Sequence, residues 1–208
     1  MAGRKVGNLL ALAVLAYLTQ GPMHPYELGR LLRDNEDTRS IKFNQGSLYM
    51  VVQQLARAGF IVEQETSRDG LRPERTVYAL TDTGRRELRD WLRELVGEPQ
   101  HEYPQFVAAL SLIAALPPAE VVELLHRRVR LLAEQRAGIR DLIDGTLARG
   151  VHPLFLVEEE YRLDLLDAES AFVERFIDRI IHPETGWAGP WAELHGAPAT
   201  TDERGKTS

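Results

Sequence analysis

The sequence predicts a mainly α-helical fold, with three helices and a β-hairpin in the N-terminal part and a long helical region after them. Three observations predict this fold class. An amphipathic stripe marks a helix after Asn44, two strand-like runs bracket a turn at Asp69 and Gly70, and apolar residues recur at helical spacing through residues 104–181. A helix followed directly by such a hairpin is the arrangement of a winged helix-turn-helix.

Two helices come first in the chain. Residues 7–19 are apolar nearly all round, which predicts a central buried helix, and Gly21 with Pro22 ends it. Pro25, which is tolerated in a first turn, opens a second helix through about residue 33. A polar loop over residues 34–42 then leads to the third helix.

The third helix has two distinct faces. Asn44 is a good N-cap, and Gly46 permits close approach of a backbone, either to the second helix or to DNA. The apolar stripe that would be buried consists of Leu48, Val51, Val52 and Leu55. The opposite face carries groups suited to base edges and phosphates in a major groove, namely Ser47, Tyr49, Met50, Gln53, Gln54 and Arg57. No acid occurs between Asp37 and Glu63, which is explained if this surface meets phosphates.

A basic hairpin follows. Residues 60–66 and 76–80 are the predicted strands, and Arg68, Arg72 and Arg75 lie at or near the tip, where they could reach a phosphate backbone or a minor groove. A solvated basic loop is the alternative. Thr81 can cap a fourth helix over about residues 82–96, in which Trp91 is most simply a core residue.

Three segments resemble the PadR family of transcriptional regulators. They are MHPYEL (23–28), GSLYMVVQQLARAGFI (46–61) and YALTDTGRREL (78–88). Arg72 and Pro73 supply the Arg-Pro pair of the family's wing. Gln45 and Met50 depart from the family, which often has Pro at both positions, so an operator sequence is not carried over.

The resemblance implies a homodimeric repressor of transcription that is released by a small molecule, often aromatic. Together with the residue pattern, it predicts a double-stranded DNA operator as partner. The predicted DNA-binding residues are Lys42, Asn44, Gln45, Ser47, Tyr49, Gln53, Gln54, Arg57, Arg68, Arg72 and Arg75. Tyr49 has an alternative role, because a partly buried Tyr can simply pack against the second helix.

Composition narrows the function classes. The 208-residue chain has no cysteine, which excludes disulfides and thiolate metal sites and fits a reducing, cytoplasmic setting. Net charge is −6, but residues 1–95 carry 14 Lys and Arg against 12 Asp and Glu, giving +2 there and −8 in the remainder. The apolar run 9–18 is too short to cross a bilayer, which takes about 20 residues. The sequence thus predicts no membrane association.

The C-terminal part predicts a dimerisation region. Residues 104–116 form a short apolar helix, residues 119–149 a long amphipathic one, and a further helix ends at about residue 181. Each of the two long helices has an apolar stripe that must be buried. A second subunit would cover part of these stripes. We expect a DNA-binding domain at 1–96, a helical dimerisation and effector domain at 97–183, and a largely disordered tail at 184–208.

Aromatic side chains on these elements offer material for a planar aromatic effector site: Trp91, Phe106, Tyr161 and Phe172, with Phe155, Phe176, Trp187 and Trp191 near them. Ordinary core and interface packing is the simpler interpretation of each. The six histidines are scattered, so neither a metal site nor a cofactor is predicted, and no catalytic constellation occurs. A winged helix used as a protein-docking module is the main alternative function, and an enzyme is a distant third.

Overall fold

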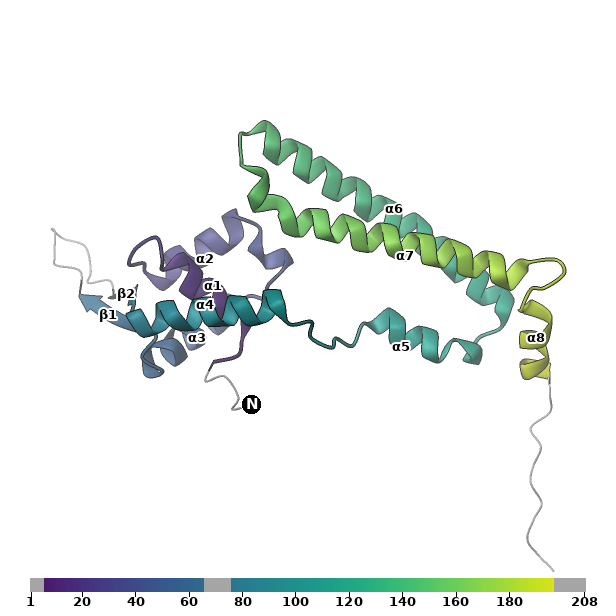
Figure 1. Cartoon of the computed structure of the whole chain (residues 1–208), viewed down its shortest axis with the longest axis horizontal. Coiled ribbons are helices and arrows are strands. Elements are labelled where there is room, and N and C mark those ends of the chain that lie inside the picture. Colours follow the sequence, from purple (N-terminus) through teal and green to yellow (C-terminus); the bar gives the residue numbers. More distant parts are fainter. Residues whose placement is uncertain (1–5, 66–75, 197–208) are drawn as a thin grey trace, which may run out of the picture. The chain divides into compact units, whose positions relative to one another are not determined.

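The computed structural model describes residues 6–65 and 76–196 of the chain (Figure 1). The chain divides into two compact units, Met1–Glu102 and Tyr103–Ser208, called here the N-terminal and the C-terminal unit. In the described parts no helix is long and apolar enough to cross a membrane.

The N-terminal unit is a winged helix-turn-helix, and the predicted fold class is confirmed. Its elements are α1 (Leu9–Tyr17), α2 (Pro25–Asp34), the 3-10 turn η1 (Asp37–Arg39), α3 (Gln45–Arg57), β1 (Ile61–Glu65), β2 (Thr76–Leu80) and α4 (Asp82–Gly97).

Helix α1 is the centre of this unit. It is shorter than the predicted 7–19 at both ends. It begins at Leu9 because Asn8 caps it by accepting a 2.9 Å hydrogen bond from the Leu10 backbone N–H. Leu10, Val14 and Leu15 have no exposed surface, and α3 and α4 both pack on α1. The all-round apolar sequence of α1 therefore fits its position between other elements.

The hairpin is antiparallel, with Ile61 opposite Leu80 and Glu65 opposite Thr76. A further bridge joins Met23 to Tyr78, so the segment before α2 adds a short edge next to β2. The predicted turn between the strands, residues 66–75, lies outside the described residues.

The start of α4 is held against the residues that follow α3 by a hydrogen bond and by close packing. Thr81 caps α4, and its hydroxyl also donates to the Gly59 carbonyl at 2.8 Å. Gly84 lies against the Phe60 carbonyl so closely that a Cβ atom at residue 84 would be 2.0 Å from that oxygen. The Gly of the exit segment is therefore required by packing, not by a turn.

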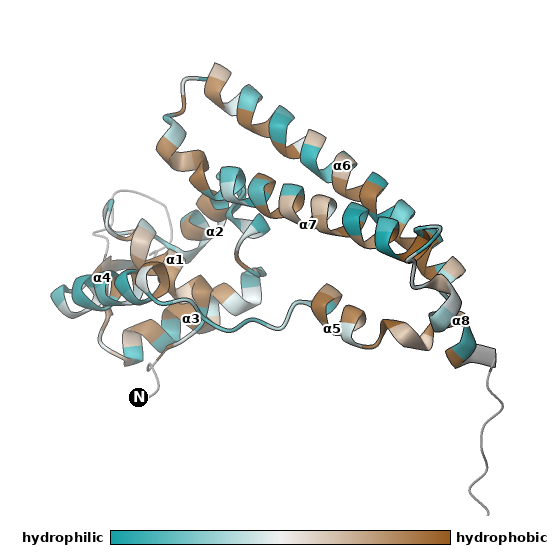
Figure 2. Cartoon of the chain, turned by 45° about the vertical axis from the view of Figure 1, so that its right-hand side comes forward, coloured by the Kyte–Doolittle hydropathy of each residue, from teal (hydrophilic) through white to brown (hydrophobic). Residues whose placement is uncertain are grey.

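The C-terminal unit is helical. Its elements are α5 (Gln105–Ser111), the 3-10 turn η2 (Ile113–Ala115), α6 (Pro118–Ala148), the 3-10 turn η3 (Pro153–Leu156), α7 (Val157–Ile181) and α8 (Ala188–Gly196). Helices α6 and α7 form a long hairpin, along which hydrophilic and hydrophobic residues alternate (Figure 2). The helix predicted over 104–116 is broken at Leu112 into α5 and η2.

The predicted disordered tail is wrong for residues 188–196, which form α8. Trp191 on α8 is only 8% exposed and joins a core cluster with Val121, Leu125, Phe176 and Ile180. Burial of this one large aromatic side chain supplies the stabilisation that a composition rich in Gly, Ala and Pro did not indicate. The rest of the tail, 197–208, lies outside the described residues.

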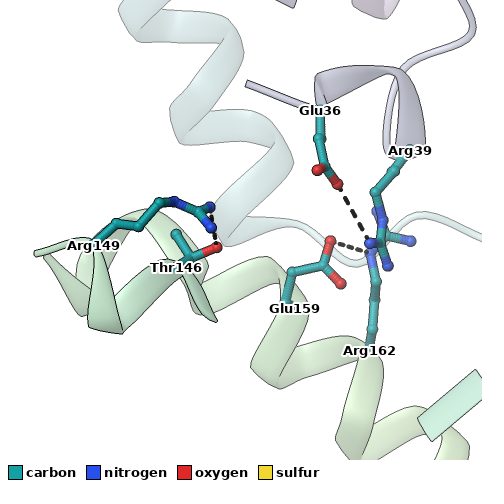
Figure 3. A network of polar contacts seen from close by, with 6 residues as sticks. All are labelled: Glu36, Arg39, Thr146, Arg149, Glu159 and Arg162. Carbon is teal, nitrogen blue, oxygen red and sulfur yellow. Dashed lines mark hydrogen bonds and ion pairs between the residues drawn. The ribbon is translucent and has the colours of Figure 1, made fainter. Parts of the chain in front are cut away.

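Pairs of polar side chains three residues apart interact near the ends of helical elements (Figure 3). In the N-terminal unit, Arg39 pairs with Glu36 at 3.6 Å. In the C-terminal unit, Arg149 donates to the Thr146 hydroxyl at 2.9 Å near the end of α6. Such exposed contacts contribute little to stability, on the order of 0–1 kcal/mol. The two apolar cores therefore dominate the stability of the units.

Candidate nucleic-acid interface

The polar face of α3 is exposed, as predicted. Leu48, Val51, Val52 and Leu55 are buried in the core, with at most 3% exposed surface. On the opposite side Tyr49 is 42% exposed and Met50 60%, and Gln53, Gln54 and Arg57 are exposed as well. Tyr49 is not part of the core cluster or of the residues packed against it. The face therefore presents amide, phenol, thioether and guanidinium groups to solvent without an acid among them.

The first turn of α3 is fixed by a capping box. Asn44 accepts a 2.8 Å hydrogen bond from the Ser47 backbone N–H, and the Ser47 hydroxyl accepts one of 3.1 Å from the Asn44 backbone N–H. The same hydroxyl donates to the Asn44 carbonyl at 2.8 Å. Two of the predicted DNA-binding side chains are thus committed to the helix N-terminus, and the hydroxyl proton of Ser47 is already used.

Gln45 is turned away from this face. Its side-chain oxygen accepts a 3.5 Å hydrogen bond from Arg33 on α2, and its Nε2 is buried without a hydrogen-bond partner in the described structure. A Cβ atom at Gly29 would be 2.9 Å from the Gln45 side-chain oxygen. The prediction that Gln45 contacts DNA therefore has no support from its side-chain position, which faces α2.

Gly29 is the glycine that brings α2 and α3 together. A Cβ atom at Gly29 would also be 3.2 Å from a methyl group of Leu48. At Gly46, in contrast, a Cβ would meet only the Asn44 side-chain oxygen, at 3.5 Å. Of the two roles expected for Gly46, close approach to the second helix is not observed, and its space is open to solvent.

Cations lie at both ends of α3. Lys42 precedes the N-cap and Arg57 ends the helix, and both are exposed. Arg68, Arg72 and Arg75 of the hairpin lie outside the described residues. Two of the five predicted basic contacts are therefore seen beside the polar face.

A partly buried polar network supports the loop that leads into α3, and sequence reasoning missed it. The Tyr17 hydroxyl on α1 donates to the Asp37 carboxylate, and Asn35 donates to the same hydroxyl at 2.7 Å. Burial and the hydrogen bond to Asp37 raise the pKa of Tyr17 to about 12. The network ties α1 to the loop between α2 and α3, so it holds the helix-turn-helix in one geometry.

The predicted ligand-binding aromatics have different surroundings within the two units. Trp91 is 5% exposed and belongs to the core of the N-terminal unit. In the C-terminal unit, Phe172 stacks on Phe176 with ring centres 5.9 Å apart, whereas Tyr161 on α7 is 64% exposed. Core packing, the simpler interpretation, accounts for Trp91.

Phe106 lies at a groove between α5 and α6. The Arg128 guanidinium is 3.5 Å from the centre of its ring and also donates to Glu169 at 2.5 Å. The groove has a volume of about 360 Å³. Its walls are almost entirely apolar: Phe106, Ala109, Leu112, Ile113, Leu116, Val121, Leu124, Leu125, Arg127, Arg128 and Leu131. Within residues 6–65 and 76–196, no group of His, Asp and Glu side chains is arranged to hold a metal ion.

Known proteins share this architecture. The model of the "Transcriptional regulator PadR-like family" matches residues 14–90, which span α2, α3, both strands and most of α4. Residues 14–90 of this chain therefore resemble the PadR-like family of transcriptional regulators. The resemblance predicted from the sequence is confirmed, and so is the interpretation of the chain as a regulator and not an enzyme.

Individual relatives extend beyond the winged helix. The chain is 27% identical over 136 residues to the negative transcriptional regulator PadR of Bacillus subtilis, covering 65% of this PadR-like chain and 71% of the relative. The structure of B. subtilis PadR in complex with operator DNA matches with a TM-score of 0.59 at 20% identity, over 80% of this chain and 99% of that one. The same protein in complex with p-coumaric acid matches with a TM-score of 0.64 at 18% identity, over 82% and 94%. These structures share the fold of both units.

Proposed function

We propose that this PadR-like regulator binds an operator in double-stranded DNA through the outward face of α3 and thereby represses transcription. The observation that carries the proposal is that face. It is exposed, free of acids and rich in side chains that pair with base edges, and it lies on a helix whose other side is anchored in the core.

The chemistry of the face divides the predicted contacts by role. Gln53 and Gln54 can each make bidentate hydrogen bonds with adenine, whereas Lys42 and Arg57 at the two ends of α3 suit phosphates. Ser47 and Asn44 act first as the helix cap, which leaves the Asn44 amide N–H groups as donors to a phosphate. The DNA complex of B. subtilis PadR supports this use of the shared fold.

The experiment selects a duplex with the full-length protein from a random-sequence pool and then measures affinity at several salt concentrations. Gln53→Ala or Gln54→Ala should cost about 1–3 kcal/mol on the selected duplex and relax specificity at one position. Lys42→Ala or Arg57→Ala should weaken all sequences alike and reduce the salt slope by about one unit. Arg140→Ala, an exposed position on α6, is the matched control.

We further propose a homodimer formed by residues 105–182, with a second copy of the chain on the apolar groove between α5 and α6. Leu112 is 72% exposed there, and Leu124 and Leu131 are each 45% exposed. Apolar groups that line one continuous groove are typical of surfaces that a partner covers. A dimer would also link two half-site contacts, which raises the effective concentration of the second.

Light scattering tests the dimer. Leu131→Asp should shift the protein toward monomer at micromolar concentration, because the charge would be buried between copies. Ala133→Asp changes a neighbouring exposed position on the same helix and should leave the dimer intact. A wild-type protein that is monomeric at this concentration would contradict the proposal.

Release of DNA by a small planar aromatic effector is the third part of the proposed function. The p-coumaric acid complex of B. subtilis PadR supports it, together with the aromatic side chains Phe106 and Phe172 in the C-terminal unit. Trp187 is 45% exposed, and its ring lies 6.2 Å from that of Phe176, so its fluorescence should report binding nearby. A panel of phenolic acids and planar dyes should contain a compound that changes this fluorescence and lowers operator affinity. If none does both, control by an effector should be abandoned.

The protein-docking alternative has one specific observation in its favour, the exposed apolar Met50 on α3. It predicts that no duplex is enriched in the selection.

A further inference from the structure

Met50 is the apolar side chain in the middle of the polar face of α3. It is 60% exposed and belongs neither to the core of its unit nor to the residues that pack against that core. Gln53 and Gln54 lie one turn later, at i+3 and i+4, and share this face with it. Met50 therefore lies outside the core that holds α3 in place, and its exposure needs another explanation.

Four residues before Met50 on the same face, the helix has no side chain. Gly46 stands at i−4, where a Cβ atom would find only the Asn44 side-chain oxygen within 4 Å. Because helical side chains lean toward the N-terminus, the Met50 side chain covers the surface over Gly46. A flat partner can thus approach α3 closely at Gly46, beside the exposed Met50 side chain.

The chemistry of the face selects among the four bases. Arg and Lys make the commonest specific contacts with guanine, but α3 has no cation before Arg57. Glutamine pairs with adenine, and an apolar side chain contacts the C5-methyl group that thymine alone projects into the major groove. Methionine suits such a contact because it is unbranched and adapts to the shape of its partner.

We propose that Met50 is a specificity-determining residue that reads thymine, through contact of its thioether end with the C5-methyl group of one thymine in each half-site. The inference rests on the proposed operator binding and adds the base that this position recognises. The contact buries one methyl group, which is worth about 0.8 kcal/mol, or about fourfold in affinity.

The test replaces thymine by uracil, one position at a time, in the duplex that the full-length protein selects. Uracil pairs as thymine does and lacks only the methyl group. At one position in each half-site, the replacement should weaken the wild type about fourfold and have no further effect on Met50→Ala. Gln53→Ala changes the same face without touching the methyl contact, so it should keep the full uracil effect at that position.

Gly46→Ala provides a second variant. The added methyl group should hold the face away from the groove, and the uracil effect should shrink although Met50 is intact.

Two results would overturn the assignment while operator binding itself stands. One is a uracil scan in which no position matters to the wild type. The other is a uracil effect that persists in full in Met50→Ala. If no duplex is enriched by the wild-type protein, operator binding fails and the role of Met50 fails with it.

Discussion

Gly84 should be among the least replaceable positions of the N-terminal unit. In Gly84→Ala the new methyl carbon would lie 2.0 Å from the Phe60 carbonyl oxygen, which is 1.4 Å short of the 3.4 Å at which ordinary contact begins. That carbonyl cannot turn away freely, because it accepts hydrogen bonds from the Thr81 backbone N–H at 3.1 Å and from the Thr81 hydroxyl at 3.0 Å. The start of α4 must move instead.

The expected cost of Gly84→Ala is about 3 kcal/mol, the upper end of the usual range for forced overpacking. Urea unfolding followed by Trp91 fluorescence, in a Trp187→Phe, Trp191→Phe background, reports this unit alone, since these are the three tryptophans of the chain. Gly46→Ala is the matched control in the first turn of another helix. Its Cβ has room, so it should be neutral or stabilise by up to about 1 kcal/mol. Equal stability of the two variants would refute the packing argument.

Two other contacts give direct predictions. Tyr17→Phe should destabilise by about 1 kcal/mol through loss of the hydrogen bond to Asp37. Because the folded pKa of Tyr17 is about 12 against 10.0 unfolded, that stability should be complete below pH 10 and lost as pH rises through 12, which absorbance titration of tyrosinate in wild type and variant would check. Arg128→Ala should make α5 more mobile, because it removes the contacts of Arg128 with Phe106 and Glu169. Hydrogen exchange in residues 105–111 should then rise at least tenfold, and unchanged protection would show that Arg128 does not hold α5.

The sequence predicted the elements whose signals are local. The stripe of α3 and its Asn44 cap are periodic or adjacent features, and both are found in the structure. Trp91 was predicted most simply as a core residue, and it is one.

Features that depend on distant residues could not be predicted in this way. The side chain of Gln45 faces α2 because Gly29, sixteen residues earlier, leaves space for it, and no local pattern in the sequence signals that contact. Likewise α8 forms where Trp191 joins a core cluster that includes Val121 and Leu125 of α6, so part of its stability comes from residues about seventy positions away. The roles of the proposed DNA contacts depend on a partner that the sequence does not contain.

We propose that DNA lies against the outward face of α3. Gln54→Glu tests it most directly, because it places one negative charge on the acid-free face with almost no change in shape. Gln135→Glu makes the same change at an exposed position of α6 and gives the same net charge. Titration of the selected duplex should show at least a tenfold loss of affinity for Gln54→Glu and wild-type affinity for Gln135→Glu, with both variants as stable as the wild type. Wild-type affinity in Gln54→Glu would contradict the claim.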